Sequence, residues 1–199
     1  MIRLVKNRNA FRMMRRKSAL ADSGILTNHK EFVMANITFK GSPIHTVGDV
    51  PKVGGKLPAF TLTKSDLSLL KSPELAGKTI ILNIFPSIDT SVCARSVRQF
   101  NVDAAGLANA TVLCISADLP FAQNRFCGAE GIKNVVTLST FRHPEFGNLT
   151  GLTIADGPLA GLLARAVIVA DGTGTIKYVQ LVPEIGQEPD YAGAIAAAK

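Results

Sequence analysis

The sequence predicts an α/β protein with a central mixed sheet, and three features of the chain lead to this prediction. Two near-continuous apolar runs, KTIILNIFP (78–86) and TVLCISAD (111–118), are typical of strands buried on both faces of a sheet. A segment with helical spacing follows the first of these runs. Near the C-terminus, ARAVIVADGTGTIKYVQLV (164–182) contains two apolar runs about an Asp-Gly-Thr-Gly turn, which indicates an antiparallel hairpin.

The first half of the chain gives its elements in this order. NITFKGSPIHTV (36–47) alternates apolar and polar residues about Gly-Ser-Pro, which predicts a β-hairpin. AFTLTKSDLSLL (59–70) predicts a short strand followed by a loop or a turn of helix. The buried strand at 78–86 ends at Pro86, and SVCARSVRQFNVDAAGL (91–107) then places apolar residues at helical spacing.

The second half continues with the buried strand at 111–118, followed by LPFAQNRFCGAEGI (119–132), which is interpreted as a polar-ended helix or a loop. A short apolar run at 134–140 leads into an irregular stretch, the hairpin at 164–182 comes next, and the Ala-rich PDYAGAIAAAK (189–199) closes the chain as a helix. This order of elements predicts a thioredoxin-like α/β sandwich with a central mixed sheet and an added N-terminal β-hairpin.

The formal charge of +7 is concentrated at the N-terminus. Residues 1–33 hold eight Lys and Arg against two acidic residues, whereas residues 34–199 carry a net charge of only +1. With 47% hydrophobic and 19% charged residues, the chain falls in the ordinary globular range. The globular part therefore lacks the basic surface that polyanion binding requires, and we expect no nucleic-acid partner.

We expect two parts, a basic and disordered leader over residues 1–33 and one folded domain over residues 34–199. The leader lacks the uninterrupted apolar stretch of about 7 to 15 residues that a secretory signal needs, which favours the cytoplasm over the periplasm. Three interpretations of it stay open: a tail from an upstream start codon or an expression vector, with Met34 as the natural start; an organellar presequence; or a polyanion-binding arm. No segment approaches the run of about 18 apolar residues of a membrane span, so we expect no membrane partner.

The chain has three cysteines, Cys93, Cys114 and Cys127, which cannot all pair within one molecule. A domain of this size needs no disulfide scaffold. Cys114 lies in a strand predicted to be buried on both faces and is interpreted as core. The histidines are scattered, and no pair of Cys or His has ligand-like spacing, which argues against a zinc or iron–sulfur site.

Cys93 lies where the strand at 78–86 gives way to the helix at 91–107, in the first turn of that helix. Unpaired N–H groups and the helix dipole stabilise an anion at this end, so the position favours a reactive thiolate. Asp89 and Thr90 are both suitable caps for the helix. The alternative, from spacing alone, is that Cys93 is a small buried hydrophobic residue, as free cysteines often are.

The string PSIDTSVC resembles the active-site loop of peroxiredoxins, in which proline, three residues, threonine, two residues and cysteine follow one another. Pro86, Thr90 and Cys93 match this pattern position for position. Further blocks resemble the thiol peroxidases, the Tpx subfamily of atypical two-cysteine peroxiredoxins: ITFKGSPIHTVG, VLCISADLPFAQNRFCGAEG, IADGPLAGLLARAVIV and the terminal PDY. The resemblance runs from Asn36 to the C-terminus and leaves out the leader.

The resemblance implies a role for each matching residue. Cys93 would be the peroxidatic cysteine and Cys127 the resolving one. Thr90 would place its hydroxyl between the thiolate and the peroxide, and Pro86 would shield the thiolate from water. Arg165, the sole basic residue in a long apolar run, would supply positive charge and, if buried, would need an anionic partner such as the Cys93 thiolate. An arginine on an exposed strand edge is the alternative for that position.

The implied activity is the reduction of hydrogen peroxide and alkyl hydroperoxides in antioxidant defence, without metal, haem or flavin. The sulfenic acid formed on Cys93 would condense with Cys127 to give a disulfide, and one or both segments would unravel for the bond to close. The resemblance further implies thioredoxin as the reductant, and a homodimer with the active-site loops near its interface.

Two other classes of function stand beside this one. A redox sensor or chaperone-like protein on the same fold would need one equivalent of peroxide, whereas an enzyme would consume many. A binder of nucleic acid or of membrane surfaces would act through residues 1–33, and removal of those residues would abolish binding while leaving the peroxide chemistry intact.

Overall fold

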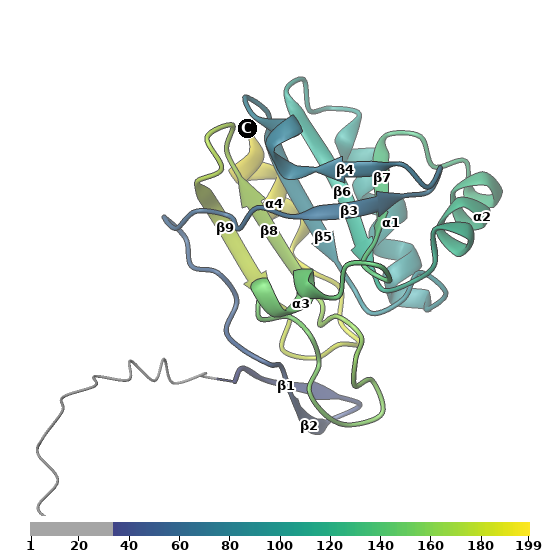
Figure 1. Cartoon of the computed structure of the whole chain (residues 1–199), viewed down its shortest axis with the longest axis vertical. Coiled ribbons are helices and arrows are strands. Elements are labelled where there is room, and N and C mark those ends of the chain that lie inside the picture. Colours follow the sequence, from purple (N-terminus) through teal and green to yellow (C-terminus); the bar gives the residue numbers. More distant parts are fainter. Residues whose placement is uncertain (1–33) are drawn as a thin grey trace, which may run out of the picture. The chain divides into compact units, whose positions relative to one another are not determined.

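A computed structural model describes residues 34–199 and shows a seven-stranded mixed sheet flanked by helices, with a separate two-stranded hairpin on its N-terminal side (Figure 1). The predicted leader, residues 1–33, lies outside the described residues. The strands are β1 (Asn36–Phe39), β2 (Ser42–His45), β3 (Thr61–Lys64), β4 (Leu69–Lys71), β5 (Thr79–Ile84), β6 (Ala110–Ser116), β7 (Val135–Ser139), β8 (Ala166–Ala170) and β9 (Ile176–Leu181). The helices are α1 (Ser91–Ala104), α2 (Pro120–Glu130), α3 (Glu145–Leu149) and α4 (Tyr191–Ala198), with a 3-10 turn at Ser72–Leu75.

The strands of the large sheet follow the order β4-β3-β7-β6-β5-β8-β9. β5 pairs in parallel with β6, and β6 in parallel with β7, while the other pairs are antiparallel. Parallel neighbours end at the same edge of a sheet, so the residues that follow β5 and β6 come together in space. The predicted thioredoxin-like sandwich and its N-terminal hairpin are confirmed.

Each face of the sheet is covered by different elements. On one face Ile81 of β5 packs in a cluster that includes Val97 and Phe100 of α1, together with side chains from α2 and α4. On the other face Leu82 and its neighbours pack against a cluster that includes Phe146 of α3. Figure 1 shows α3 in front of the sheet, while α1 and α4 lie behind it. The two-face burial explains the continuous apolar character of β5 and β6.

The segment 119–132, left between helix and loop by the sequence, contains the helix α2. Pro120 occupies its first turn, where a missing N–H costs nothing. Gly131 ends it in the left-handed conformation at φ 63°, and its N–H donates to the carbonyl of Cys127. These two residues fix the bounds of the helix that carries Cys127.

The loop expected after the first strand of segment 59–70 is present at residues 65–68, but the sequence did not predict the strand β4 that follows it and pairs antiparallel with β3. The turn between them is held by Asp66, whose carboxylate accepts from the N–H and the hydroxyl of Ser68. The helix α3 was likewise absent from the predicted elements. Both are shorter than the stretch over which a hydrophobic period becomes visible.

The N-terminal hairpin is attached to the rest of the fold by backbone hydrogen bonds of Thr38 and His45 and by two carboxylates. Glu184 accepts from the backbone N–H groups of Lys40 and Gly41 in the hairpin turn. Asp156 accepts from the backbone N–H of His45 at 2.8 Å and contacts its ring Nδ1 at 2.6 Å.

Within residues 34–199, the helices are too short or too polar to cross a bilayer.

Candidate active site

The loop between β5 and α1 is the first part of the site. Pro86 is buried and follows Phe85 directly, where it cannot donate to a continued strand ladder. The carboxylate of Asp118, at the end of the parallel neighbour β6, accepts from the Ser87 hydroxyl at 2.8 Å and from the Ile88 N–H at 2.7 Å. Thr90 then takes extended φ and ψ of −102° and 147° as the N-cap residue, and α1 begins at the next position.

Cys93 is the third residue of α1 and therefore lies in its first turn. The side chain is fully buried, with 0% exposure, in the apolar cluster beneath the helix. Its Sγ accepts a hydrogen bond from Nη2 of Arg165 at 3.3 Å. The guanidinium and the N-terminal end of the helix both bring positive charge close to this sulfur.

Arg165 lies one residue before β8 and is 1% exposed, so the alternative of an arginine on an exposed strand edge does not hold. Its Nε donates to the carbonyl of Ile185 at 2.9 Å, which orients the guanidinium. Nη1 has no partner among the described residues. A buried cation is costly unless an anion compensates it, and the Cys93 sulfur is the side chain that its Nη2 contacts.

Thr90 and Pro86 belong to the loop that leads into α1. Thr90 is exposed, and its hydroxyl donates to the backbone carbonyl of Ser87 at 3.0 Å. The lone pairs of that hydroxyl stay available to accept a hydrogen bond from a ligand. The structure thus brings Pro86, Thr90, Cys93 and Arg165 to one end of α1.

Cys127 lies elsewhere, in the second half of α2, and is half-buried. Its Sγ makes a 3.9 Å contact with Oγ1 of Thr137 on β7. Burial raises the pKa of the Cys127 thiol, with the Thr137 hydroxyl acting in the opposite direction. Cys93 and Cys127 are both free thiols in this structure.

Cys114 is fully buried on β6, as its interpretation as core requires. Burial raises the pKa of this thiol to about 12, against a weaker opposing effect of the Asn83 amide. The Asn83 Nδ2 lies 3.6 Å from the sulfur and 3.2 Å from the hydroxyl of Ser96 on α1. A thiol that stays protonated at neutral pH is a poor nucleophile.

The surface above the Cys93 turn is a shallow hollow. Arg95 and Arg98 lie on its rim but are paired, with Glu188 at 3.1 Å and with Glu130 at 2.8 Å, so they belong to a solvated helix face. Thr90, an exposed residue of the string PSIDTSVC, is among the residues that line this hollow. The lining residues are Ile88, Asp89, Thr90, Ser91, Ala94, Arg95, Arg98 and Phe126.

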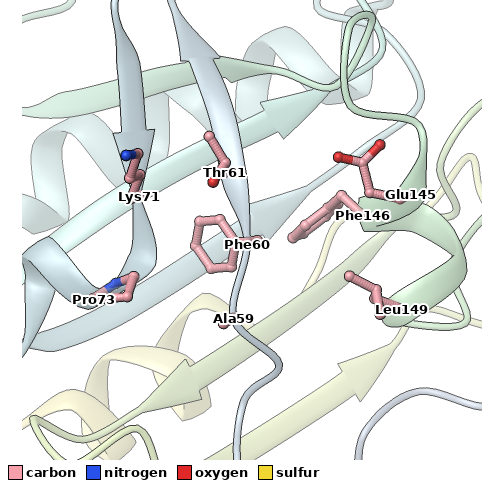
Figure 2. A pocket seen from close by; sticks show the side chains of 8 residues that line it. All are labelled: Ala59, Phe60, Thr61, Lys71, Pro73, Glu145, Phe146 and Leu149. Atoms are coloured by element: carbon pink, nitrogen blue, oxygen red, sulfur yellow. The ribbon is translucent and has the colours of Figure 1, made fainter.

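A second hollow lies on the opposite face of the sheet, and Figure 2 shows its lining side chains. Phe60 and Phe146 form its base, edge to face with ring centroids 5.4 Å apart, and Lys71 and Glu145 stand at its sides. It contains no cysteine and belongs to the cluster on the far side of the sheet from Cys93. We therefore place the candidate chemistry at α1.

Sequence reasoning missed Asp118 as part of this site. A signal was present, because Asp118 follows the buried run TVLCIS just as Pro86 follows the other buried run. If both runs are neighbouring parallel strands, the residues after them meet at one edge.

Among residues 34–199, no three His, Cys, Asp or Glu side chains are grouped so that they could hold a metal ion.

Comparison with known proteins adds an independent line of support. The Redoxin family model matches residues 52–195. Thiol peroxidases from Mycobacterium bovis and Mycobacterium tuberculosis are each 58% identical over 164 residues, which cover 82% of this chain and 98% of theirs.

Solved structures show the same likeness. A peroxiredoxin-like protein from Aquifex aeolicus superposes with a TM-score of 0.77 at 38% identity, covering 83% of this chain and 96% of that one. A thiol peroxidase from Chromobacterium violaceum has a TM-score of 0.75, covers 82% of this chain and 93% of its own, and shares 20% identity, which supports the fold alone.

Proposed function

This chain belongs to the thiol peroxidases of the peroxiredoxin family and is a peroxiredoxin-type oxidoreductase, and on that premise we propose that it reduces hydrogen peroxide and alkyl hydroperoxides through Cys93. The observation that supports the proposal most directly is the buried contact of 3.3 Å between Arg165 Nη2 and Cys93 Sγ. It pairs a nucleophilic sulfur with a fixed positive charge at a helix N-terminus.

In the proposed peroxide step the Cys93 thiolate attacks one oxygen of the O–O bond. An S–O bond forms, the O–O bond breaks, and the departing oxygen takes up a proton to leave as water or an alcohol. The sulfur is oxidised to a sulfenic acid while the peroxide is reduced by the same two electrons. Arg165 stabilises the negative charge as it moves from sulfur to the departing oxygen.

Thr90 and Pro86 prepare the substrate for this attack. The Thr90 oxygen accepts the O–H of the peroxide and holds the O–O bond in line with the sulfur, which removes the entropy cost of alignment. Pro86, buried and without an N–H, keeps water away from the thiolate. The hollow beside Thr90 is the proposed route of entry, since Cys93 itself is fully buried in the described state.

In the proposed second step the Cys127 sulfur attacks the sulfenic acid, forms the disulfide and releases water. The two sulfurs have different partners in this structure, Arg165 for Cys93 and Thr137 for Cys127. Because Cys93 is also fully buried, the proposal includes a local opening of α1 or α2 before the bond forms. Opening also exposes the Cys127 thiol to water and removes the burial that raises its pKa.

Thioredoxin is the proposed reductant, and its two thiols would return both cysteines to the reduced state by thiol–disulfide exchange. We place this cycle in the cytoplasm, where such a reductant keeps thiols reduced.

We also propose a homodimer at the edge beside the active-site loop. Phe121 and Phe141 are 66% and 65% exposed. The Ser139 hydroxyl connects the segments that carry them, because it donates to the Asp118 carbonyl and accepts from the Phe141 N–H. Two exposed aromatic side chains favour burial against a second copy of the chain.

The test separates the three thiols. We predict that Cys93→Ser abolishes peroxide consumption coupled to thioredoxin, and that Cys127→Ser loses the coupled turnover while still forming one sulfenic acid per chain. Cys114→Val is the matched control and retains most of the turnover, because Cys114 is buried and protonated.

Mass spectrometry of reduced protein treated with one equivalent of hydrogen peroxide and then alkylated completes the test. The expected product links Cys93 to Cys127 and leaves Cys114 alkylated after unfolding. A link that involves Cys114 would contradict the assignment of the resolving cysteine. Consumption of one equivalent of peroxide without turnover in the presence of thioredoxin would favour the sensor alternative.

A further inference from the structure

We infer that Asp118 is a positioning residue for the peroxide step: it holds the loop between β5 and α1 in the conformation that presents the Thr90 hydroxyl. The inference rests on the proposed function of Cys93 and Thr90 and adds a residue from a different strand to it. Asp118 touches neither the sulfur nor, in the proposed mechanism, the peroxide.

Three hydrogen bonds converge on the carboxylate of Asp118. Oδ1 accepts from the hydroxyl of Ser87 at 2.8 Å, and Oδ2 accepts from the N–H of Ile88 at 2.7 Å and from the hydroxyl of Ser116 at 2.7 Å. The residue is partly buried, so these bonds are less screened by water than surface contacts. Two of the three donors belong to the active-site loop.

The backbone of Asp118 is itself fixed. Its carbonyl accepts from the hydroxyl of Ser139, at the end of β7, at 2.6 Å, and that hydroxyl oxygen in turn accepts from the N–H of Phe141. Ser116 belongs to β6 and accepts a further hydrogen bond from the buried side chain of Gln123 at 3.1 Å. The carboxylate is therefore anchored to the rigid edge of the sheet and not to another loop.

The restraint passes from Asp118 to the peroxide-binding hydroxyl through one residue. Ser87, which Asp118 holds by its hydroxyl, uses its backbone carbonyl to accept from both the hydroxyl and the N–H of Thr90, at 3.0 and 3.2 Å. Thr90 is also the N-cap residue of α1, which starts at Ser91. Loss of the Asp118 bonds would release the Ser87 carbonyl and, with it, the direction of the Thr90 hydroxyl.

The substitutions Asp118→Ala and Asp118→Asn separate positioning by hydrogen bonds from an effect of charge. Alanine removes both acceptor oxygens and with them all three hydrogen bonds. Asparagine can replace them, because its amide oxygen accepts from Ile88 and Ser116 while its NH₂ donates to the Ser87 oxygen, whose own proton can rotate away. Asparagine therefore preserves the loop but not the charge.

Asp171 provides a matched control. Its carboxylate also receives three short bonds, from the N–H and hydroxyl of Thr173 and from the N–H of Thr175, at 2.7 to 3.0 Å, and it holds the turn between β8 and β9. Asp171→Ala removes a similar set of bonds from a loop that the proposed mechanism does not use.

Two rate constants of the reduced protein are measured for each variant: the reaction of Cys93 with hydrogen peroxide and its alkylation by iodoacetamide, both followed by peptide mass spectrometry. Alkylation needs the thiolate but no aligned O–O bond. For Asp118→Ala we expect the peroxide rate to fall by about 10²-fold, the cost of a misplaced reacting group, with alkylation not slowed. Asp118→Asn should stay within a few-fold of the wild type, and Asp171→Ala should match it.

Three results would overturn the inference: an unchanged peroxide rate in Asp118→Ala, equal losses in both reactions, or a loss in Asp118→Asn as large as in the alanine variant. If Asp118→Ala does not fold, Ser87→Ala replaces it, since it removes the bond from Ser87 to Asp118, together with the 3.3 Å contact of the Asp89 N–H with Ser87 Oγ, and should still lower the peroxide rate relative to alkylation. If Cys93 of the wild-type protein does not react with peroxide, the proposed function itself is refuted. The wild-type measurement thus separates failure of the proposed function from failure of the inference on Asp118.

Discussion

At the scale of single residues, the three cysteines show how position decides the chemistry of one residue type. Cys93 and Cys114 are equally buried, with 0% exposure each. Cys93, however, has a guanidinium at 3.3 Å and a helix N-terminus, whereas Cys114 has an amide at 3.6 Å and apolar neighbours within a sheet. Burial suppresses ionisation of a thiol, whereas a neighbouring cation acts in the opposite direction. The two thiols therefore differ in their neighbours and not in their burial.

The raised pKa of Cys114 predicts a pH dependence of stability. The folded thiol keeps its proton up to a pKa of about 12, while an unfolded cysteine ionises with a pKa of about 8.5. Above about pH 8.5 the unfolded state therefore binds fewer protons than the folded state, and the free energy of unfolding falls as pH rises towards 12. Between pH 7 and pH 10 this contribution amounts to about 2 kcal/mol.

Urea unfolding of the wild type and of Cys114→Val at pH 7 and pH 10, under reducing conditions, measures this contribution. Lysine and tyrosine ionisation affects both proteins alike, so the difference between them isolates Cys114. We expect the wild type to lose about 2 kcal/mol more than the variant. Equal losses would mean that Cys114 is not kept protonated by the fold.

The sequence singled out Cys93, Thr90, Pro86 and Arg165, because each stands at a distinctive place in a loop string or an apolar run, and their roles in the chemistry stay a prediction. It could not show that Arg165 is buried against Cys93, because that contact joins residues 72 positions apart. Asp118 was missed for a related reason: its three partners are polar groups whose convergence depends on the register of two parallel strands.

At the scale of elements, α1 and α2 are held to the sheet in different ways. α1 buries Val97 and Phe100 completely. α2 buries the side chain of Gln123, which donates to Ser116 and to the carbonyl of Leu138, and its large apolar contact is Phe126. A helix with a largely polar contact layer loses less hydrophobic free energy on detachment, so α2 is the element that we expect to open more readily.

One exposed ion pair links the two helices and offers a test. Arg98 of α1 donates through Nε and Nη2 to the two carboxylate oxygens of Glu130 at the end of α2, both at 2.8 Å. We predict that Glu130→Gln raises the rate of Cys93–Cys127 disulfide formation after peroxide addition by a few-fold, because the ion pair no longer opposes opening. The free energy of unfolding should change little, since exposed pairs contribute little to stability.

Lys177→Gln is the control, since it breaks a comparable exposed pair with Asp171, at 3.0 Å, that does not bridge the two helices. Stopped-flow fluorescence or quenched alkylation follows disulfide formation in each variant. A rate in Glu130→Gln that is equal to or lower than that of the control would show that separation of α1 from α2 does not limit the bond.

The elements differ in how well the sequence predicted them. Long apolar or periodic runs in the sequence predict one type of secondary structure clearly, and this holds for β5, β6, β8 and α1. β4 has three residues and α3 has five, and their formation depends on pairing with β3 and on burial of Phe146 against the sheet. Such tertiary contacts override weak local preference, which a single sequence does not record.

At the scale of the whole molecule, the parallel pairing of β5 with β6 is what assembles the site. It brings the end of one strand, followed by Pro86, beside the end of the other, followed by Asp118, while antiparallel β8 brings in Arg165 on the other side. The fold class indicates the order of the strands in the sheet. Which residues meet at its edge, here those after β5 and β6, depends on the pairing register of these two strands, which the sequence alone does not give.

The division of charge along the chain gives the last prediction. Residues 1–33 carry +6 of the formal +7, and the proposed chemistry uses residues from 34–199 alone. A chain of residues 34–199 should therefore reduce peroxide at the rate of the full chain and unfold at the same temperature. Its retention on heparin, a sulfated polyanion, should fall to that of a nearly neutral protein, because retention depends on net positive charge.

Salt elution from heparin and coupled peroxide turnover, measured on both chains, test the two halves of this prediction separately. Equal retention of both chains would place a polyanion surface in residues 34–199 and contradict the charge argument, since those residues carry a net charge of +1. A loss of turnover in the shorter chain would mean that residues 1–33 contribute to the peroxide reaction, and no residue of the proposed mechanism explains such a contribution.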